Sequence, residues 1–223
     1  MLIDDLRAAF RPFARPEKVA EMQAYLRTTE PMLGLTVPQT RAVAHAVARE
    51  HLGRSPAEHD VLAAATEVWE AAQSRDERRA AIFILVRYAR VLSVAAMPTI
   101  ERFVVDGAWW DLVDALVKAQ TSISTNDAEG SAQVMRAWAR HESFWVRRYA
   151  ILSQLQAKAT TDTALLADCI VPNLADSEFF VAKAIGWALR DYAKTAPEWV
   201  REFVAKHEQQ MQPLSKREAL KHL

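Results

Sequence analysis

The stretch WWDLVD, at residues 109–114, decides how we interpret the fold of this chain. If the segment is helical, four apolar residues follow the spacing i, i+3, i+4, i+7 and form a buried stripe. These residues are Trp109, Leu112, Val113 and Leu116. Trp110 and Asp114 then lie one helical turn apart on the neighbouring face. An aromatic ring beside a carboxylate is an arrangement that holds a cation, although a boundary tryptophan and a solvated aspartate would have the same spacing.

The aromatic pair in this stretch recurs at a fixed interval. Trp109-Trp110, Phe144-Trp145 and Phe179-Phe180 open three expected helices, and each step is 35 residues (144 − 109 and 179 − 144). One further helix fits between successive pairs, so the repeating unit is a helix pair, as in HEAT-like repeats of about 34 to 47 residues. Such pairs stack into a curved solenoid with a concave surface. The alternative is a helical bundle in which the three pairs are accidental.

Apolar residues follow helical periodicity along the whole chain, and glycine is scarce at five residues. We therefore predict an all-α fold, with residues 1–223 as a single domain of HEAT-like helical repeats that form a curved α-solenoid with a concave face. Besides the helix at WWDLVD, helices are expected at 2–13, 16–28, 38–52, 61–72, 75–91, 95–105, 132–140, 143–158, 162–174, 177–194, 197–210 and 215–221. We expect a structured connection at 31–38 and a loop at 121–130 (TSISTNDAEG), because Ser, Thr, Asn and Asp compete with helix through side-chain hydrogen bonds.

Composition limits the possible functions. Lys+Arg and Asp+Glu both number 28, so affinity for a polyanion has to come from segregated charge. Cys169 is the one cysteine, and the six histidines show no metal-binding spacing, so we expect no disulfide, no metal and no cofactor. The sequence has no apolar run of transmembrane length and no basic leader, so we expect a soluble, cytoplasmic monomer without a membrane partner.

Charged residues in the second and third repeats depart from ordinary patterning. Arg148 lies on the apolar stripe of its helix, one turn from Phe144, and needs either an internal carboxylate or a ligand phosphate. Arg147 is expected on an ordinary solvent face. The third repeat carries a row at i, i+4, i+7, i+11, made of Lys183, Trp187, Arg190 and Lys194.

Three cations interrupted by a tryptophan suit a surface that grips a polyanionic backbone and packs a ring or sugar. A solvated basic helix face would have the same composition. The final basic segment contains Lys216 and Arg217, and we expect it to be a plain surface helix.

Six stretches together resemble the AlkD-type DNA alkylation repair glycosylases, in the right order over nearly the whole chain. They are PEKVAEMQAYL (16–26), LGLTVPQTR (33–41), WWDLVD (109–114), FWVRRYAIL (144–152), FFVAKAIGWALRDYAK (179–194) and LSKREALKHL (214–223). The resemblance implies an all-α protein of HEAT-like repeats that removes N3- and N7-alkylated purines from duplex DNA. It also implies work on the deoxyribose from outside the duplex, without a base-binding pocket.

The resemblance also implies the site residues. Asp114 corresponds to the catalytic aspartate, Trp110 and Trp187 to the sugar-packing tryptophans, and Arg148 to the DNA-contacting arginine. Lys183, Arg190, Lys194, Lys216 and Arg217 are expected to add DNA contacts. A non-catalytic α-solenoid that binds DNA or a protein is the alternative, but a scaffold has no reason to keep a carboxylate in a basic groove, where it weakens phosphate binding.

Overall fold

The computed structural model describes residues 1–223 and contains helices and turns but no strand, which confirms the all-α prediction. The chain forms two compact units, Met1–Phe103 and Val104–Leu223, and the boundary between them falls within helix α6 (Met97–Gly107). None of the helices is both long enough and apolar enough to cross a membrane.

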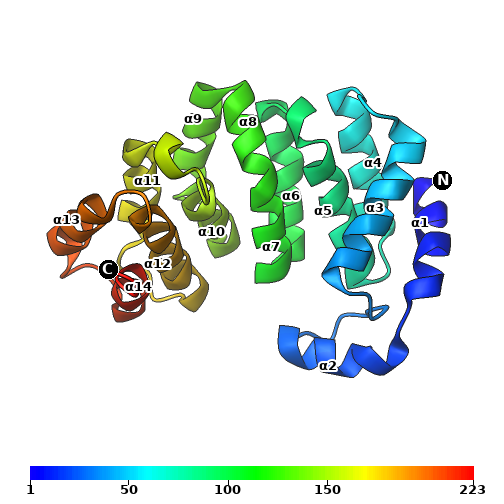
Figure 1. The fold of residues 1–223 in the computed structure, drawn as a ribbon, viewed down its shortest axis with the longest axis horizontal. Helices are drawn as coiled ribbons and strands as arrows, with labels where there is room; N and C mark the ends of the chain where they lie inside the picture. The colour runs from blue at the N-terminus through cyan, green and yellow to red at the C-terminus, as the bar shows by residue number, and fades with distance from the viewer. The chain divides into compact units, whose positions relative to one another are not determined.

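The first unit is a group of packed helices at the blue and cyan end of the chain (Figure 1). Its helices are α1 (Leu2–Phe10), α2 (Pro16–Leu26), α3 (Val37–Leu52), α4 (Glu58–Ala71) and α5 (Arg75–Arg87). Helices α3 and α5 each begin with a capping box, made by Thr36 with Gln39 and by Ser74 with Glu77. Reciprocal side-chain hydrogen bonds of this kind satisfy backbone N–H groups that the first helical turn leaves unpaired.

The predicted connection at 31–38 is held by the start of α5. The carboxylate of Asp76 accepts a hydrogen bond from the backbone N–H of Leu33 at 2.7 Å. Arg75 donates its backbone N–H to the carbonyl of Pro31 and its guanidinium to Glu30, both at 2.9 Å. These contacts satisfy the polar groups of a segment that has no helix of its own.

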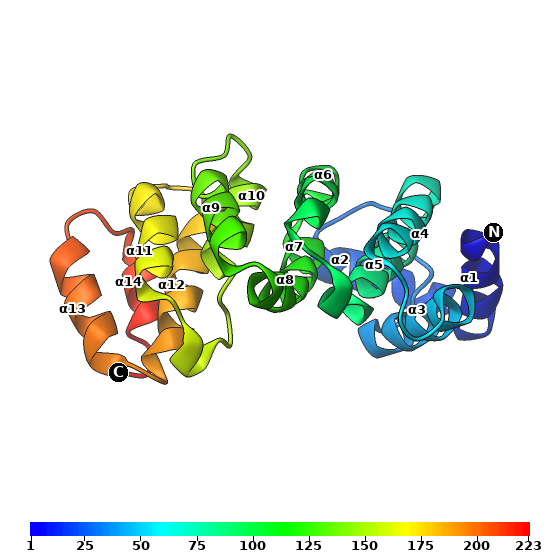
Figure 2. The same cartoon turned by 90° about the horizontal axis from the view of Figure 1, so that it is seen from above.

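The second unit consists of α7 (Trp110–Leu116), α8 (Gln120–Asn126), α9 (Ala128–Trp138), α10 (Phe144–Leu152), α11 (Thr163–Ile170), α12 (Phe179–Ala193), α13 (Pro197–His207) and α14 (Pro213–Ala219). Helices α7, α10, α12 and α14 pack successively against one another and form one row. Helix α9 packs against α11, and α9, α11 and α13 lie beside that row as the other members of three helix pairs (Figures 1 and 2). All of the candidate site residues belong to the row α7–α10–α12–α14 or to the turn that follows α12.

The three aromatic pairs meet inside the second unit. The ring of Trp145 lies 5.8 Å from that of Trp109 and 4.7 Å from that of Phe180, and the rings of Trp109 and Phe180 are 5.4 Å apart. Phe144 and Phe179 extend the cluster through Trp145 and Phe180. The interval of 35 residues therefore marks equivalent positions in stacked helices, not accidental pairs.

The prediction of a loop at 121–130 is wrong, because most of these residues are helical in α8 and α9. Gln120 is fully buried and donates to the hydroxyls of Ser131 at 2.6 Å and Ser124 at 3.1 Å. Tyr149 of α10 donates its hydroxyl to the Gln120 side-chain oxygen at 3.1 Å. Several polar side chains of this region therefore bond to one another, within α8 and across to α9 and α10, and the helices are not interrupted by them.

Two predictions for helices of the second unit, α10 and α14, also need correction. Helix α10 ends at Leu152, six residues before the predicted position, in a turn that leads to Gln156, whose φ is +67°. Helix α14 is not a plain surface helix, because Ser215 and Glu218 are buried against α12. A Cβ at Gly186 of α12 would lie 2.4 Å from the Cβ of Glu218 and 3.0 Å from the carbonyl oxygen of Ser215. Only glycine permits this close approach of the two helices.

We predict that Gly186→Ala destabilises the protein by about 1–3 kcal/mol, because the added methyl group overpacks the contact between α12 and α14. Helix propensity alone would change stability by up to about 1 kcal/mol in the opposite direction. Urea denaturation of the two proteins distinguishes these effects, and a variant as stable as the wild type or more so would contradict the packing described here.

Candidate functional site

The centre of the candidate site is an ion pair between Asp114 of α7 and Arg148 of α10. The guanidinium Nε donates to Oδ1 and Nη2 donates to Oδ2, both at 2.8 Å. This bidentate geometry fixes the orientation of the carboxylate as well as its position. Of the two partners that Arg148 was expected to need, the structure supplies the internal carboxylate.

Arg148 is also held by α12. Its Nη1 donates to the backbone carbonyl of Phe180 at 2.7 Å, and its Cζ lies 5.9 Å from the ring centroids of Phe180 and Trp187. The side chain is only 3% exposed. In this position it presents no face to a DNA phosphate, so a direct contact requires the guanidinium to turn away from Asp114.

Opposing effects act on the pKa of Asp114. Burial raises this pKa above the ordinary aspartate value, while the hydrogen bonds and positive charge of Arg148 lower it. Desolvation is the larger effect, and the neighbouring carboxylate of Asp111 adds to it. The Asp114 side chain is 19% exposed, so it is not fully closed off from solvent.

Of the two tryptophans predicted to pack against the sugar, Trp110 lies on the helix of Asp114 and Trp187 lies on α12. Trp110 is half-buried, and it begins α7 one turn before Asp114, as the spacing predicts. Trp187 is 37% exposed and lies beside the guanidinium of Arg148. The structure therefore brings Asp114, Arg148 and Trp187 together, with Trp110 on the same helix as the carboxylate.

The basic row on α12 is partly neutralised by a carboxylate that sequence analysis did not single out. Glu218 of α14 accepts from Lys183 Nζ at 2.9 Å and from Arg190 Nη1 at 2.5 Å. The hydrogen bond from Lys183 holds the pKa of Glu218 below its usual range, despite the opposing effect of burial. The signal that could have found it is the repeat itself, since Arg148, Lys183 and Glu218 are spaced 35 residues apart (183 − 148 and 218 − 183).

Of the other predicted DNA-binding cations, Lys194 and Arg217 are exposed, and Lys216 is 31% exposed. Lys194 is 71% exposed and pairs with Asp191 at 3.0 Å, while Lys216 pairs with Glu208 at 2.8 Å. Exposed pairs of this kind contribute only about 0–1 kcal/mol, so a phosphate can displace the carboxylate. Arg217 is exposed on α14.

Arg147, predicted to lie on an ordinary solvent face, instead joins two segments of the second unit. Its Nη1 donates to the carbonyls of His141 and Glu142 at 2.8 and 2.9 Å, and its Nη2 binds Asp176 at 2.8 Å. The side chain is 20% exposed. Adjacent arginines on α10 therefore have different roles, with Arg147 supporting connections between helices and Arg148 holding Asp114.

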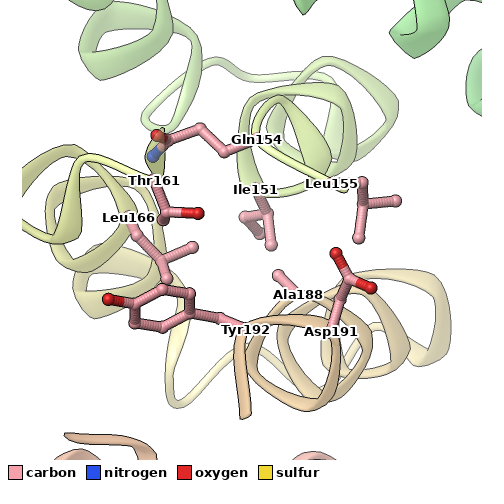
Figure 3. A pocket seen from close by; sticks show the side chains of 8 residues that line it. All are labelled: Ile151, Gln154, Leu155, Thr161, Leu166, Ala188, Asp191 and Tyr192. Carbon is pink, nitrogen blue, oxygen red and sulfur yellow. The ribbon is translucent and has the colours of Figure 1, made fainter. Parts of the chain in front are cut away.

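A separate hollow lies between α10, α12 and the segment that precedes α11 (Figure 3). It is lined by Ile151, Gln154, Leu155, Thr161, Leu166, Ala188, Asp191 and Tyr192. Tyr192 is half-buried at the edge of this hollow. The internal volume of about 10 Å³ matches a single water molecule, so the hollow does not admit a purine base.

The fold and the site define an all-helical protein in which a carboxylate is held among aromatic rings and cations. Residues 6–223 match the family model described as DNA alkylation repair enzyme, and the chain belongs to this family. The match runs through both compact units. A comparison with curated proteins finds no match.

Two solved structures resemble the chain. A predicted DNA alkylation repair enzyme from Enterococcus faecalis is 28% identical, with a TM-score of 0.85 over 94% of this chain and 96% of that one. The alkylpurine DNA glycosylase AlkC of Pseudomonas fluorescens, bound to DNA containing an abasic site analog, is 17% identical, with a TM-score of 0.55. The match covers 99% of this chain and 60% of AlkC, and at 17% identity this likeness concerns the fold alone.

We predict that Arg148→Gln raises the pKa of Asp114 further, because the variant loses the charge and the hydrogen bonds that oppose burial. The buried carboxylate loses its partner, so stability falls by about 3 kcal/mol at neutral pH. A native pKa above the unfolded value favours folding at low pH, so the deficit shrinks as pH falls through the pKa of Asp114. Carboxyl NMR titration and denaturation at several pH values measure both effects, and an unchanged or lower pKa would contradict this account.

Proposed function

We propose that this protein is a DNA glycosylase that removes cationic N3- and N7-alkylated purines from duplex DNA by hydrolysing the N-glycosidic bond. The observation that carries the proposal is the pairing of Asp114 with Arg148 beside the exposed ring of Trp187. Membership of the DNA alkylation repair enzyme family and the AlkD-type resemblance of the motifs support the same activity.

The chemistry of such a lesion needs few groups. A purine alkylated at N3 or N7 is already cationic, so when the C1′–N bond breaks, both electrons go to the purine nitrogen and neutralise its charge. The leaving group therefore needs no general acid. The enzyme has to stabilise the oxocarbenium-like sugar and direct water to C1′, with the proton of that water passing to Asp114 or to solvent.

Asp114 is the group that we assign to both tasks. Its carboxylate stabilises the developing positive charge on the sugar and positions the attacking water. Arg148 acts on it as a positioning residue, since the bidentate pair holds both oxygens in a fixed plane and favours the ionised form. The Asp114 side chain is 19% exposed, and the sugar would approach it from solvent through this exposed part.

Trp110 and Trp187 are assigned to the sugar. Electron-rich ring faces attract a cationic sugar, each by about 0.5–2 kcal/mol when the contact is desolvated. Lys194, Lys216 and Arg217 are assigned to DNA phosphates. Lys194 and Arg217 are exposed, and the carboxylate that pairs with Lys216 is 64% exposed, so a phosphate can displace it. With zero net charge on the chain, affinity for DNA depends on this handful of contacts and falls steeply with salt.

The main test is release of base from duplex DNA that has been treated with a methylating agent. We predict that Asp114→Asn lowers the rate by about 100-fold or more, because the variant removes the charge that stabilises the transition state. Trp187→Ala should lower it by about 2- to 30-fold, the kinetic equivalent of one ring contact. Equal release by wild type and Asp114→Asn would refute the role assigned to Asp114, whereas no release by either protein would favour a non-catalytic DNA-binding solenoid.

A second test uses the charge of the lesion. We predict rapid release of 7-methylguanine and little or no release of uracil or hypoxanthine, because no group in the site is assigned to protonate a neutral leaving base. Excision of neutral and cationic lesions can be compared on duplexes that differ only at the damaged position. Similar rates for both would contradict the mechanism while leaving the glycosylase activity intact.

A further inference from the structure

We propose that Glu218 is a specificity residue that withholds Lys183 and Arg190 from DNA phosphates and so keeps binding to undamaged DNA weak. The inference rests on the proposed DNA-binding role of this face, and it concerns a carboxylate to which the proposed chemistry gives no task. Glu218 lies on α14, and both cations lie on α12.

The two ion pairs enclose the position of Trp187 along the helix. Lys183 precedes this tryptophan by four residues and Arg190 follows it by three, so the three side chains share one face of α12. Each oxygen of Glu218 binds one of the cations, Oε1 the ammonium of Lys183 and Oε2 the guanidinium of Arg190. The two cations and one anion leave a single net positive charge beside the tryptophan instead of two.

The burial of its carboxylate distinguishes this cluster from the more exposed pair of Lys216 with Glu208. The Glu218 side chain is 11% exposed, whereas the carboxylate of Glu208, which binds Lys216, is 64% exposed. A phosphate can replace an exposed carboxylate at little cost. Displacing Glu218 would leave a largely buried carboxylate without its partners, which is strongly unfavourable.

The backbone holds Glu218 in this place. Gly186 lets α14 approach α12 closely, and the hydroxyl of Ser215 donates to the carbonyl of Ala182 at 2.9 Å. Ser215 and Glu218 are separated by one helical turn, so the contact that docks α14 also fixes the carboxylate over the two cations. The cluster of Glu218 with Lys183 and Arg190 is therefore part of the packing between α12 and α14, not a flexible surface pair.

The positive charge of the proposed substrate explains why pairing Lys183 and Arg190 with Glu218 would be useful. Two uncompensated cations beside Trp187 would attract every phosphate and repel a cationic purine or an oxocarbenium-like sugar. Glu218 weakens both effects, because the face keeps enough positive charge to approach DNA while the selection of a lesion is left to Asp114 and the tryptophans.

The test measures binding of the full chain to an undamaged duplex at several salt concentrations. We predict that Glu218→Gln binds this duplex more tightly. The slope of log K against log[salt] should become steeper by up to about 2, close to 0.9 for each additional phosphate that the variant neutralises. Undamaged competitor DNA should then inhibit base release by Glu218→Gln more strongly than release by the wild type.

Three further variants make the result specific. Glu198→Gln removes one negative charge from an exposed i,i+3 pair with Arg201, and it should leave the slope unchanged. Adding Lys183→Gln and Arg190→Gln to Glu218→Gln should abolish the tighter binding. If Glu218→Gln fails to fold, Glu218→Asp keeps the charge but is too short to span both cations, and it should steepen the slope by about 1.

Equal slopes and affinities for wild type and Glu218→Gln, or tighter binding that persists in the triple variant, would overturn the proposal. The duplex-binding measurement does not depend on base release. A chain without glycosylase activity that shows the predicted change of slope would refute the proposed function and leave the role of Glu218 standing.

Discussion

The buried pair of Arg148 and Asp114 is the interaction on which the rest of the site depends. An arginine that is 3% exposed needs full hydrogen bonding, and it obtains this from the carboxylate on α7 and a carbonyl on α12. The guanidinium thus connects three neighbouring helices of one row. Any shift of α7 or α12 relative to α10 would break a charged hydrogen bond, so the stacking of the helices and the orientation of the carboxylate are set together.

In the second unit, the residues that hold the helices together differ from those that we assign to DNA and to the sugar. The aromatic cluster of Trp109, Trp145 and Phe180 and the polar network around Gln120 hold the helices together. The charged and aromatic side chains that we assign to DNA and to the sugar lie on one row of helices. A repeat fold allows this division because each helix pair buries its apolar faces against its neighbours and leaves one edge of each repeat free for function.

Residue patterns were enough to predict most of the helices and to mark the central residues of the site, but not the ion pairs that those residues form. Helical periodicity identified the helices, and the interval of 35 residues identified positions whose rings meet in space. The same patterns marked Asp114, Trp110, Arg148 and Trp187 as unusual. They failed at residues 121–130, where Ser124 bonds to the side chains of Gln120 in α8 and Ser131 in α9. They also failed at α14, where Ser215 and Glu218 are buried among basic residues.

The sequence by itself determined the helical class, the repeat interval and the residue types available for chemistry, because local periodicity and composition encode these properties. Only the tertiary structure decided which charges are paired. The choice of Asp114 as the partner of Arg148, and of Glu218 as the shared partner of Lys183 and Arg190, depends on contacts across 34, 35 and 28 residues. Those contacts follow from the stacking register and close approach of helices, which the periodicity of a single helix does not specify.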